Sequence, residues 1–143
     1  MDTTIAKEKI FFVSIGFYHT LCCTGNILNL ILVDAKTFSW GYSENGRLGS
    51  VDKSECDQKK KFLTPREVYT LKGNKIAQVF AGHHHSMAIA LSGKVFGWGE
   101  NVNRVLGELK NEGNNKKKSS KNTILYLPEE LSLNKNLIVK KLK

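Results

Sequence analysis

The sequence predicts an all-β protein built from repeated, four-stranded antiparallel sheets. Two long segments carry the same motifs in the same order, which indicates a repeat architecture. The runs between the motifs are short, rich in β-branched and aromatic residues, and bounded by Gly or Asn, whereas helical periodicity is weak throughout. Four short strands per repeat form the blade of a β-propeller. We therefore expect a partial β-propeller of about two blades and the start of a third, with loops rich in Lys and Asn.

Each repeat contains a Gly-x-x-His motif, then a Trp-Gly pair and finally a Leu-Gly pair. Glycine allows a tight turn and the imidazole can bind neighbouring backbone groups, so we assign the histidines a structural role. The tryptophans end a strand, and we expect them to be buried between blades. The signature residues are Gly16, His19, Trp40, Gly41, Leu48 and Gly49 in the first repeat, and Gly82, His85, Trp98, Gly99, Leu106 and Gly107 in the second.

The repeats divide the chain into successive segments. The first repeat covers residues 10–49 and the second covers 65–107. A basic polar linker (50–64) joins them, and a low-complexity basic loop (108–126) follows the second repeat. Residues 127–143 look like the start of a third repeat, because the segment after Leu127 resembles the one that begins at Pro65. In the second repeat we expect strands at about 67–71, 76–81, 86–91 and 94–99.

The first repeat carries an insertion at about residues 25–34. Twenty residues separate His19 from Trp40, but only 12 separate His85 from Trp98. The second repeat reads as an ordinary tight hairpin, whereas the first predicts a longer one that projects the apolar stretch 27–33. The sequence leaves open whether this stretch adds a strand, packs on a neighbouring element or is an artefact of the gene model.

The strings 81–86 and 93–99, Ala-Gly-His-His-His-Ser and Gly-Lys-Val-Phe-Gly-Trp-Gly, resemble the repeat of the regulator-of-chromosome-condensation family. The resemblance covers residues 10–49 and 65–107. It implies a ring of about seven blades, which two repeats cannot close, so we expect a fragment, a degenerate relative or one part of an assembly. One departure is Arg104, which stands where the first repeat has Gly46. This predicts a distorted turn if that position needs a positive φ.

We predict no catalytic, cofactor-binding or metal-binding residues. Glu44 and Glu100 are lone carboxylates in turns, without a partner for acid–base chemistry. The run 83–85 has the composition of a metal tract, but neighbouring side chains in a strand or tight turn point to opposite sides. Cys22 and Cys23 are read as small strand residues, and no disulfide framework is expected.

The chain has a net charge of +9 over 143 residues, with Lys clusters at 59–61, 116–121 and 140–143. The resemblance implies a protein–protein interaction module whose partner is a small GTPase or a chromatin component, with nucleotide exchange only in a complete ring. The alternative is a basic chromatin- or nucleic-acid-associated protein, although the Lys clusters lack interleaved aromatic residues for stacking. No signal peptide is present and the longest apolar run is too short to span a bilayer, so we expect an intracellular protein of the cytoplasm or nucleus.

Overall fold

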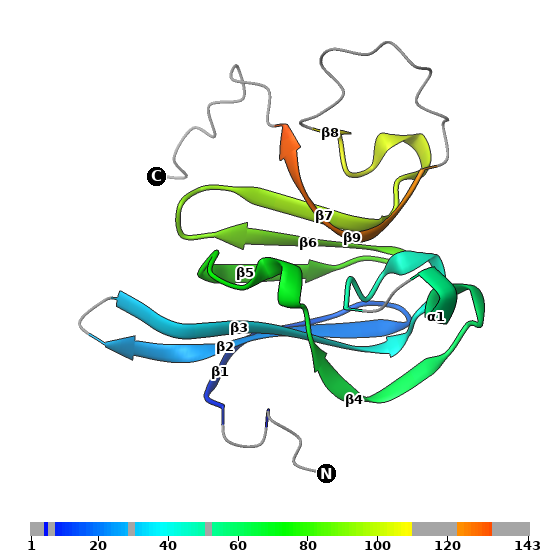
Figure 1. Cartoon of the computed structure of the whole chain (residues 1–143). Helices are drawn as coiled ribbons and strands as arrows, with labels where there is room; N and C mark the ends of the chain where they lie inside the picture. The colour runs from blue at the N-terminus through cyan, green and yellow to red at the C-terminus, as the bar shows by residue number, and fades with distance from the viewer. Residues whose placement is uncertain (1–4, 6–7, 29–30, 51–52, 110–122, 133–143) are drawn as a thin grey trace.

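The computed structural model describes residues 5, 8–28, 31–50, 53–109 and 123–132. They form two antiparallel sheets that lie one above the other, with the N-terminal sheet at the bottom of Figure 1. The expected all-β architecture is confirmed. Strands also occupy the stretch 76–90, where a helix would have contradicted the prediction.

The first sheet has the strand order β1-β2-β3-β4. Consecutive strands pair in sequence order, as expected when short turns join neighbouring antiparallel strands. A short helix, α1 (Lys53–Asp57), lies between the third and fourth strands. The strands are β1 (Ile10–Ile15), β2 (His19–Leu28), β3 (Ile31–Tyr42) and β4 (Lys61–Glu67).

The second sheet has the order β5-β6-β7-β9-β8, in which β8 adds only two residues at the edge. Its first four strands repeat the meander of the first sheet. The strands are β5 (Ile76–Ala81), β6 (His85–Ala90), β7 (Val95–Glu100), β8 (Glu108–Leu109) and β9 (Ile124–Ser132).

The assignment of strands to repeats needs a correction. The sequence predicted a strand at 67–71 that opens the second repeat. Instead, β4 pairs with β3 as the fourth strand of the first sheet, and residues 69–71 form a 3-10 turn. In the same way β9 pairs with β7 and completes the second sheet, while residues 133–143 of the expected third repeat lie outside the described residues. Self-similarity fixes the period of a repeat, but hydrogen bonding decides which sheet each strand joins.

The insertion in the first repeat lengthens a hairpin and adds no strand to the described sheets. Strands β2 and β3 stay paired as far as Leu28 and Ile31, and residues 29–30 lie outside the described residues. A bulge at Gly25, with φ 151°, interrupts the register at the base of the extension. Leu32 is buried, so this part of the apolar stretch is covered.

The turn that was expected to be distorted keeps its conformation. Asn45 and Gly46 have φ of 60° and 70°, and their counterparts Asn103 and Arg104 have φ of 54° and 58°. Arg104 therefore adopts a left-handed conformation that glycine would adopt without steric cost. The substitution is accommodated by local strain instead of a change of turn.

The main hydrophobic core lies between the two sheets. Leu21 and Cys23 of β2 belong to the same buried cluster as Val79, Phe96 and Trp98 of the second sheet. The predicted burial of Trp98 is confirmed, because none of its surface is exposed. Both Cys22 and Cys23 are buried, and burial raises the pKa of their thiols to about 11 and about 12.

No helix among the described residues is long and apolar enough to cross a membrane.

Candidate binding surface at the joint between the sheets

The two sheets meet where the turn at residues 47–49 docks on Trp98. The indole Nε1–H of Trp98 donates a hydrogen bond to the carbonyl oxygen of Arg47 at 2.9 Å, and the hydroxyl of Ser86 donates to the same oxygen at 2.8 Å. A Cβ on Gly49 would lie 2.6 Å from Nε1 of Trp98. The absence of a side chain at Gly49 is therefore what lets the turn approach the indole ring.

His19 of β2, in the first sheet, contacts Ser86 of β6, in the second sheet. Its Nε2 lies 2.7 Å from the Ser86 hydroxyl, whose single proton goes to the Arg47 carbonyl. Nε2 must then carry a proton and donate it, which leaves Nδ1 as the unprotonated nitrogen. That Nδ1 is buried without a hydrogen-bond partner among the described residues. Burial, followed by the positive charge of Arg47 and the nearby His85 and His84, lowers the pKa of His19 to about 4.

The Gly-x-x-His turns of the two sheets touch each other. Gly16 N–H donates to the carbonyl of His19, and Gly82 N–H donates to that of His85, at 2.8 and 2.9 Å. A Cβ on Gly16 would lie 2.5 Å from the Gly82 carbonyl oxygen, which also accepts a bond from Phe17 N–H at 3.3 Å. The residues between Gly and His are therefore brought together at one end of the joint.

Four ring side chains form an aromatic patch there: Phe17, Tyr18, His83 and His84. Phe17 lies 4.8 Å from Tyr18 and 4.7 Å from His83, measured between ring centroids. Tyr18 stacks on His84 at 5.8 Å. Phe17 is 71% exposed and Tyr18 is 40% exposed. The patch is thus a contiguous ring surface, contributed by both sheets and open to solvent.

A buried cation lies beneath the patch. The guanidinium of Arg47 is 5.1 Å from the Tyr18 ring centroid, and the residue is only 1% exposed. Its Nε donates to the Glu44 carbonyl at 2.6 Å, and its side chain forms an ion pair of 3.6 Å with the Glu44 carboxylate. Glu44 also pairs with Lys59 at 3.0 Å, and this contact is the main cause that lowers its pKa. These contacts hold a positive charge against the Tyr18 ring.

The fold places aromatic rings beside basic residues, which the sequence analysis did not anticipate. Lys61 Nζ lies 5.3 Å from the ring centroid of Tyr42, because β3 and β4 pair at these two residues. Arg66 lies 4.4 Å from the centroid of Phe62. The 59–61 cluster has no aromatic residue interleaved with its lysines in the sequence, but the fold brings the ring of Tyr42 beside Lys61. The other two Lys clusters lie outside the described residues.

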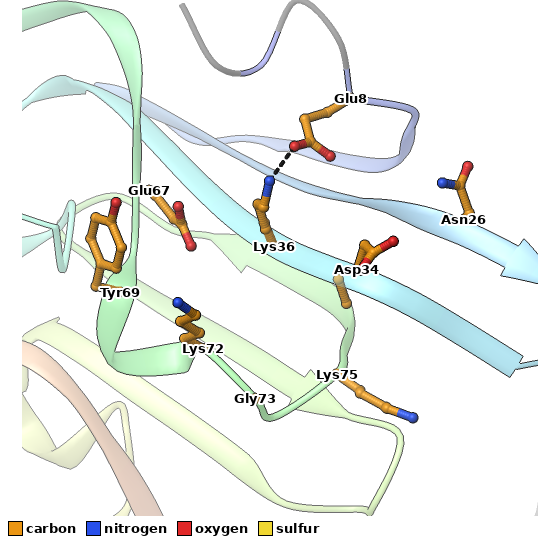
Figure 2. A pocket seen from close by; sticks show the side chains of 10 residues that line it. Glu8, Asn26, Asp34, Lys36, Glu67, Tyr69, Lys72, Gly73 and Lys75 are labelled. Atoms are coloured by element: carbon orange, nitrogen blue, oxygen red, sulfur yellow. Dashed lines mark hydrogen bonds and ion pairs between the residues drawn. The ribbon is translucent and has the colours of Figure 1, made fainter.

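A hollow of about 580 Å³ lies between the extended hairpin and the connection that leads into β5. Figure 2 shows Lys36 pointing at Glu8, with which it forms an ion pair, and Glu67 and Tyr69 on the neighbouring wall. Asn26 and Asp34 come from the insertion, and Lys72 and Lys75 come from the second repeat. Charges of both signs line this hollow, so its electrostatics favour no single class of ligand.

Comparison with known proteins identifies the repeats. The family model "Regulator of chromosome condensation (RCC1) repeat" matches residues 34–89, and a second model with the same description matches 76–104. The chain belongs to the RCC1 repeat family. Among curated proteins, it is 39% identical to human "Probable E3 ubiquitin-protein ligase HERC6" over 98 residues and 38% identical to human "Probable E3 ubiquitin-protein ligase HERC3" over 101 residues.

Solved structures show the same fold. Human WBSCR16 covers 90% of the chain with a TM-score of 0.61 at 19% identity, and yeast RCC1 (Prp20) bound to Kap60 covers 87% with a TM-score of 0.61 at 18% identity. The chain spans about a quarter of each of these structures, 26% in both cases. The matches to HERC6 and HERC3 include 68% and 71% of this chain, but only 8% of the length of each of those proteins.

The RCC1 signature residues occupy unequal environments in the two repeats. His19 and Trp98 are buried at the joint, whereas their counterparts His85 and Trp40 are only half-buried. Gly41 and Gly99 have φ of 119° and 94°. Leu48 and Leu106 are buried, and Gly49 packs on Trp98, whereas the Cβ position of Gly107 meets nothing within 4 Å among the described residues. His19, Gly49 and Trp98 therefore form the joint between the sheets, whereas their counterparts His85, Gly107 and Trp40 do not take part in it among the described residues.

The sequence analysis missed the aromatic patch and Arg47. The Gly-x-x-His motif specifies only the Gly and the His, and any residue type can stand at the two positions between them. A usable signal was present, because those two positions hold Phe and Tyr in one repeat and two His in the other. Large rings in a tight turn have little room to be buried, so they are candidates for an exposed contact surface.

Proposed function

We propose that this chain acts as a protein-binding module, two neighbouring blades of an RCC1-type propeller, with the aromatic patch as its contact surface. The observation that carries the proposal is the exposure of Phe17, Tyr18 and His83 in one contiguous patch over the buried charge of Arg47. Aromatic residues and arginine are the types enriched at the centres of protein interfaces.

The chemistry of the patch favours a protein ligand. Its rings contact one another largely edge to face, which fixes their orientation before binding and lowers the entropic cost of association. A partner with an apolar anchor and polar backbone groups fits this arrangement.

The similar proteins supply candidate partners. Yeast RCC1 (Prp20) was crystallised with Kap60, and Prp20p was described together with its binding properties to Gsp1p and histones. We therefore propose a protein partner of the small-GTPase or chromatin-component class. The proposal is one of binding, not of catalysis: the ligase activity named for the HERC proteins is not carried to this chain, which covers a small part of their length. Nucleotide exchange is proposed only for a complete ring that contains these blades.

Binding of purified core histones and of Gsp1p to the full chain would test the proposal. Phe17→Ser and His83→Ser should each weaken binding to the cognate partner about tenfold or more, as expected when a central aromatic contact is removed. Tyr69→Ser is the matched control, because Tyr69 is similarly exposed, at 68%, but lies in the 3-10 turn at the hollow beside the extended hairpin. Equal weakening by all three variants, or by none, would reject the patch as the contact surface.

A second candidate function is nucleic-acid binding, favoured by the contact of Lys61 Nζ with the Tyr42 ring beside the exposed lysines 59 and 60. Single-strand binding surfaces typically combine aromatic rings, on which bases stack, with lysines that contact the phosphates. Titration of a labelled single-stranded oligonucleotide at several salt concentrations would separate this function from the first. Phosphate contacts predict a steep loss of affinity with salt, and Lys61→Gln should reduce that slope.

A further inference from the structure

Strand β4 carries the only Ser/Thr-Pro pair in the sequence. The chain has two prolines, Pro65 and Pro128, and only Pro65 follows a residue with a hydroxyl group, Thr64. Proline has no backbone N–H, so an enzyme pocket that offers no acceptor for an N–H selects proline over other residues at that position. Proline-directed protein kinases, which phosphorylate Ser or Thr before Pro, use this kind of selection. The pair is therefore a candidate modification site, provided that its surroundings let an enzyme reach it.

The structure places Thr64 in a bulge at the edge of the first sheet. β4 is the last strand of this sheet, so its outer side pairs with no other strand among the described residues. Its pairing with β3 is interrupted between Phe62 and Arg66, and residues 63–65 form the bulge. Thr64 is exposed, and its neighbour Leu63 is 75% exposed. An irregular segment at a strand edge opens more easily than a paired one, so an enzyme that binds extended chains can reach this hydroxyl.

The second sheet shows that this edge position stays exposed when a neighbouring sheet is present. β9 carries the corresponding pair, Leu127-Pro128, and its register with β7 shifts at the corresponding point. Tyr126 packs on Leu48 of the first repeat, yet Leu127 beside it is still 47% exposed. Thr64 occupies the same position in the first sheet, and it is exposed with the second sheet in place. Its exposure is therefore a property of the bulge.

Basic residues flank Thr64 on both sides along the chain. The exposed lysines 59–61 precede the bulge. The guanidinium of Arg66 lies 4.4 Å from the centroid of the Phe62 ring, so its charge stands across the base of the bulge. It also forms an ion pair of 3.4 Å with Glu55, in which both side chains are partly exposed. A phosphate on threonine carries a charge of about −1.5 to −2 at pH 7, and a guanidinium binds it with two parallel hydrogen bonds. The surroundings of Thr64 therefore stabilise a phosphate.

We propose that Thr64 is phosphorylated by a proline-directed protein kinase and that the phosphate then pairs with Arg66. In this transfer the Thr64 oxygen forms a bond to the γ-phosphorus of ATP, the bond from that phosphorus to the ADP oxygen breaks, and the hydroxyl proton passes to the catalytic base of the kinase. The new charge lies beside lysines 59–61, so it lowers the positive charge of the surface assigned to nucleic acid. This consequence rests on the second candidate function, whereas the modification itself does not.

Incubation of the full chain with a purified cyclin-dependent kinase and MgATP, followed by mass spectrometry, would test the modification. Thr64 should be phosphorylated, and Thr64→Ala and Pro65→Ala should each lower the initial rate about tenfold or more. Thr70→Ala is the matched control, because Thr70 is also an exposed threonine but precedes a leucine, and it should leave the rate unchanged. Gly49→Ala, whose Cβ would collide with Trp98 and weaken the joint, should also leave the rate unchanged. A rate that rises in this variant would show that the kinase acts only on the unfolded chain, and it would overturn the proposal, as would the absence of phosphate at Thr64.

Two further measurements test what the phosphate does. A phosphate that pairs with Arg66 titrates at lower pH, so Arg66→Gln should raise the phosphate pKa in phosphorus NMR, and an unchanged pKa would overturn the pairing. The phosphorylated chain should bind a labelled single-stranded oligonucleotide about tenfold more weakly than the unmodified chain. Kinase-treated Thr64→Ala should bind it as the unmodified chain does, and equal affinity of the phosphorylated chain would overturn the effect on the lysine surface. Phosphorylation at Thr64 without oligonucleotide binding in either form would reject the second candidate function and support the modification site.

Discussion

Gly49→Ala should destabilise the chain more than Gly107→Ala, although both residues occupy the same position in their repeats. Each glycine has a positive φ, 62° and 79°, so an alanine pays a similar backbone cost at either site. The surroundings differ, because the new Cβ would lie 2.6 Å from Trp98 Nε1 at position 49 and in open space at position 107. The comparison therefore isolates the packing of the joint.

The expected magnitude follows from two contributions. A left-handed conformation costs a non-glycine residue roughly 1–2 kcal/mol. The gain from a less flexible unfolded chain offsets about 0.4–1 kcal/mol of this cost. Gly107→Ala should then lower the free energy of unfolding by roughly 0–1.6 kcal/mol. The clash with Trp98 adds the cost of overpacking, roughly 1–3 kcal/mol, so the difference between the two variants should be about 1–3 kcal/mol.

Urea unfolding followed by tryptophan fluorescence measures this difference, with the protein dilute enough to remain monomeric. Trp98 should shift its emission on unfolding, since it passes from a fully buried site to water. Equal m-values would show that the variants share the same unfolded state. If the two free energies agreed within about 0.5 kcal/mol, the usual scatter of a neutral surface change, the close approach of Gly49 to Trp98 would not stabilise the joint.

Further predictions follow from the same joint and from the charge of the chain. Trp98→Ala should cost roughly 3–5 kcal/mol and the half-buried Trp40 clearly less, and a melting curve unchanged by Trp98→Ala would show that the core is misassigned. Folded His19 has a pKa of about 4 against 6.5 for the unfolded side chain, so the unfolded state takes up the proton first as the pH falls. Stability should therefore be complete above about pH 6.5 and decline towards pH 4, by up to about 3 kcal/mol, and His19→Gln, which keeps the donor, should flatten this profile. The chain alone should not accelerate nucleotide release from small GTPases, and a many-fold acceleration in a fluorescent-nucleotide assay would contradict a purely binding role. Self-association measured by light scattering should increase with ionic strength, because salt screens the repulsion of a chain with net charge +9; association that weakens with salt would indicate charge pairing instead.

Some features of the candidate site could be read from the sequence only in outline. The Gly-x-x-His and Trp-Gly motifs located the tight turns and the buried Trp98, because glycine geometry and a large apolar ring constrain a strand end regardless of its neighbours. The aromatic patch could not be predicted, since Phe17 and His83 are 66 residues apart in the sequence and come together only when the two turns touch. The same holds for Lys61 and Tyr42, whose contact depends on the pairing of β3 with β4.

The sequence by itself determined the all-β class, the repeat and its family, because these depend on residue types and spacing along the chain. It did not determine which sheet each strand joins. Residues 61–67 and 124–132 complete the sheets that precede them, since a strand pairs with whichever edge is free and within reach. The tertiary structure also decided that equivalent residues differ: Trp98 is covered by the turn at Gly49, whereas Trp40 is half-buried and lines an open pocket in the described part of the chain. A motif specifies what a residue can bind, but only the arrangement of the two sheets decides whether that partner is present.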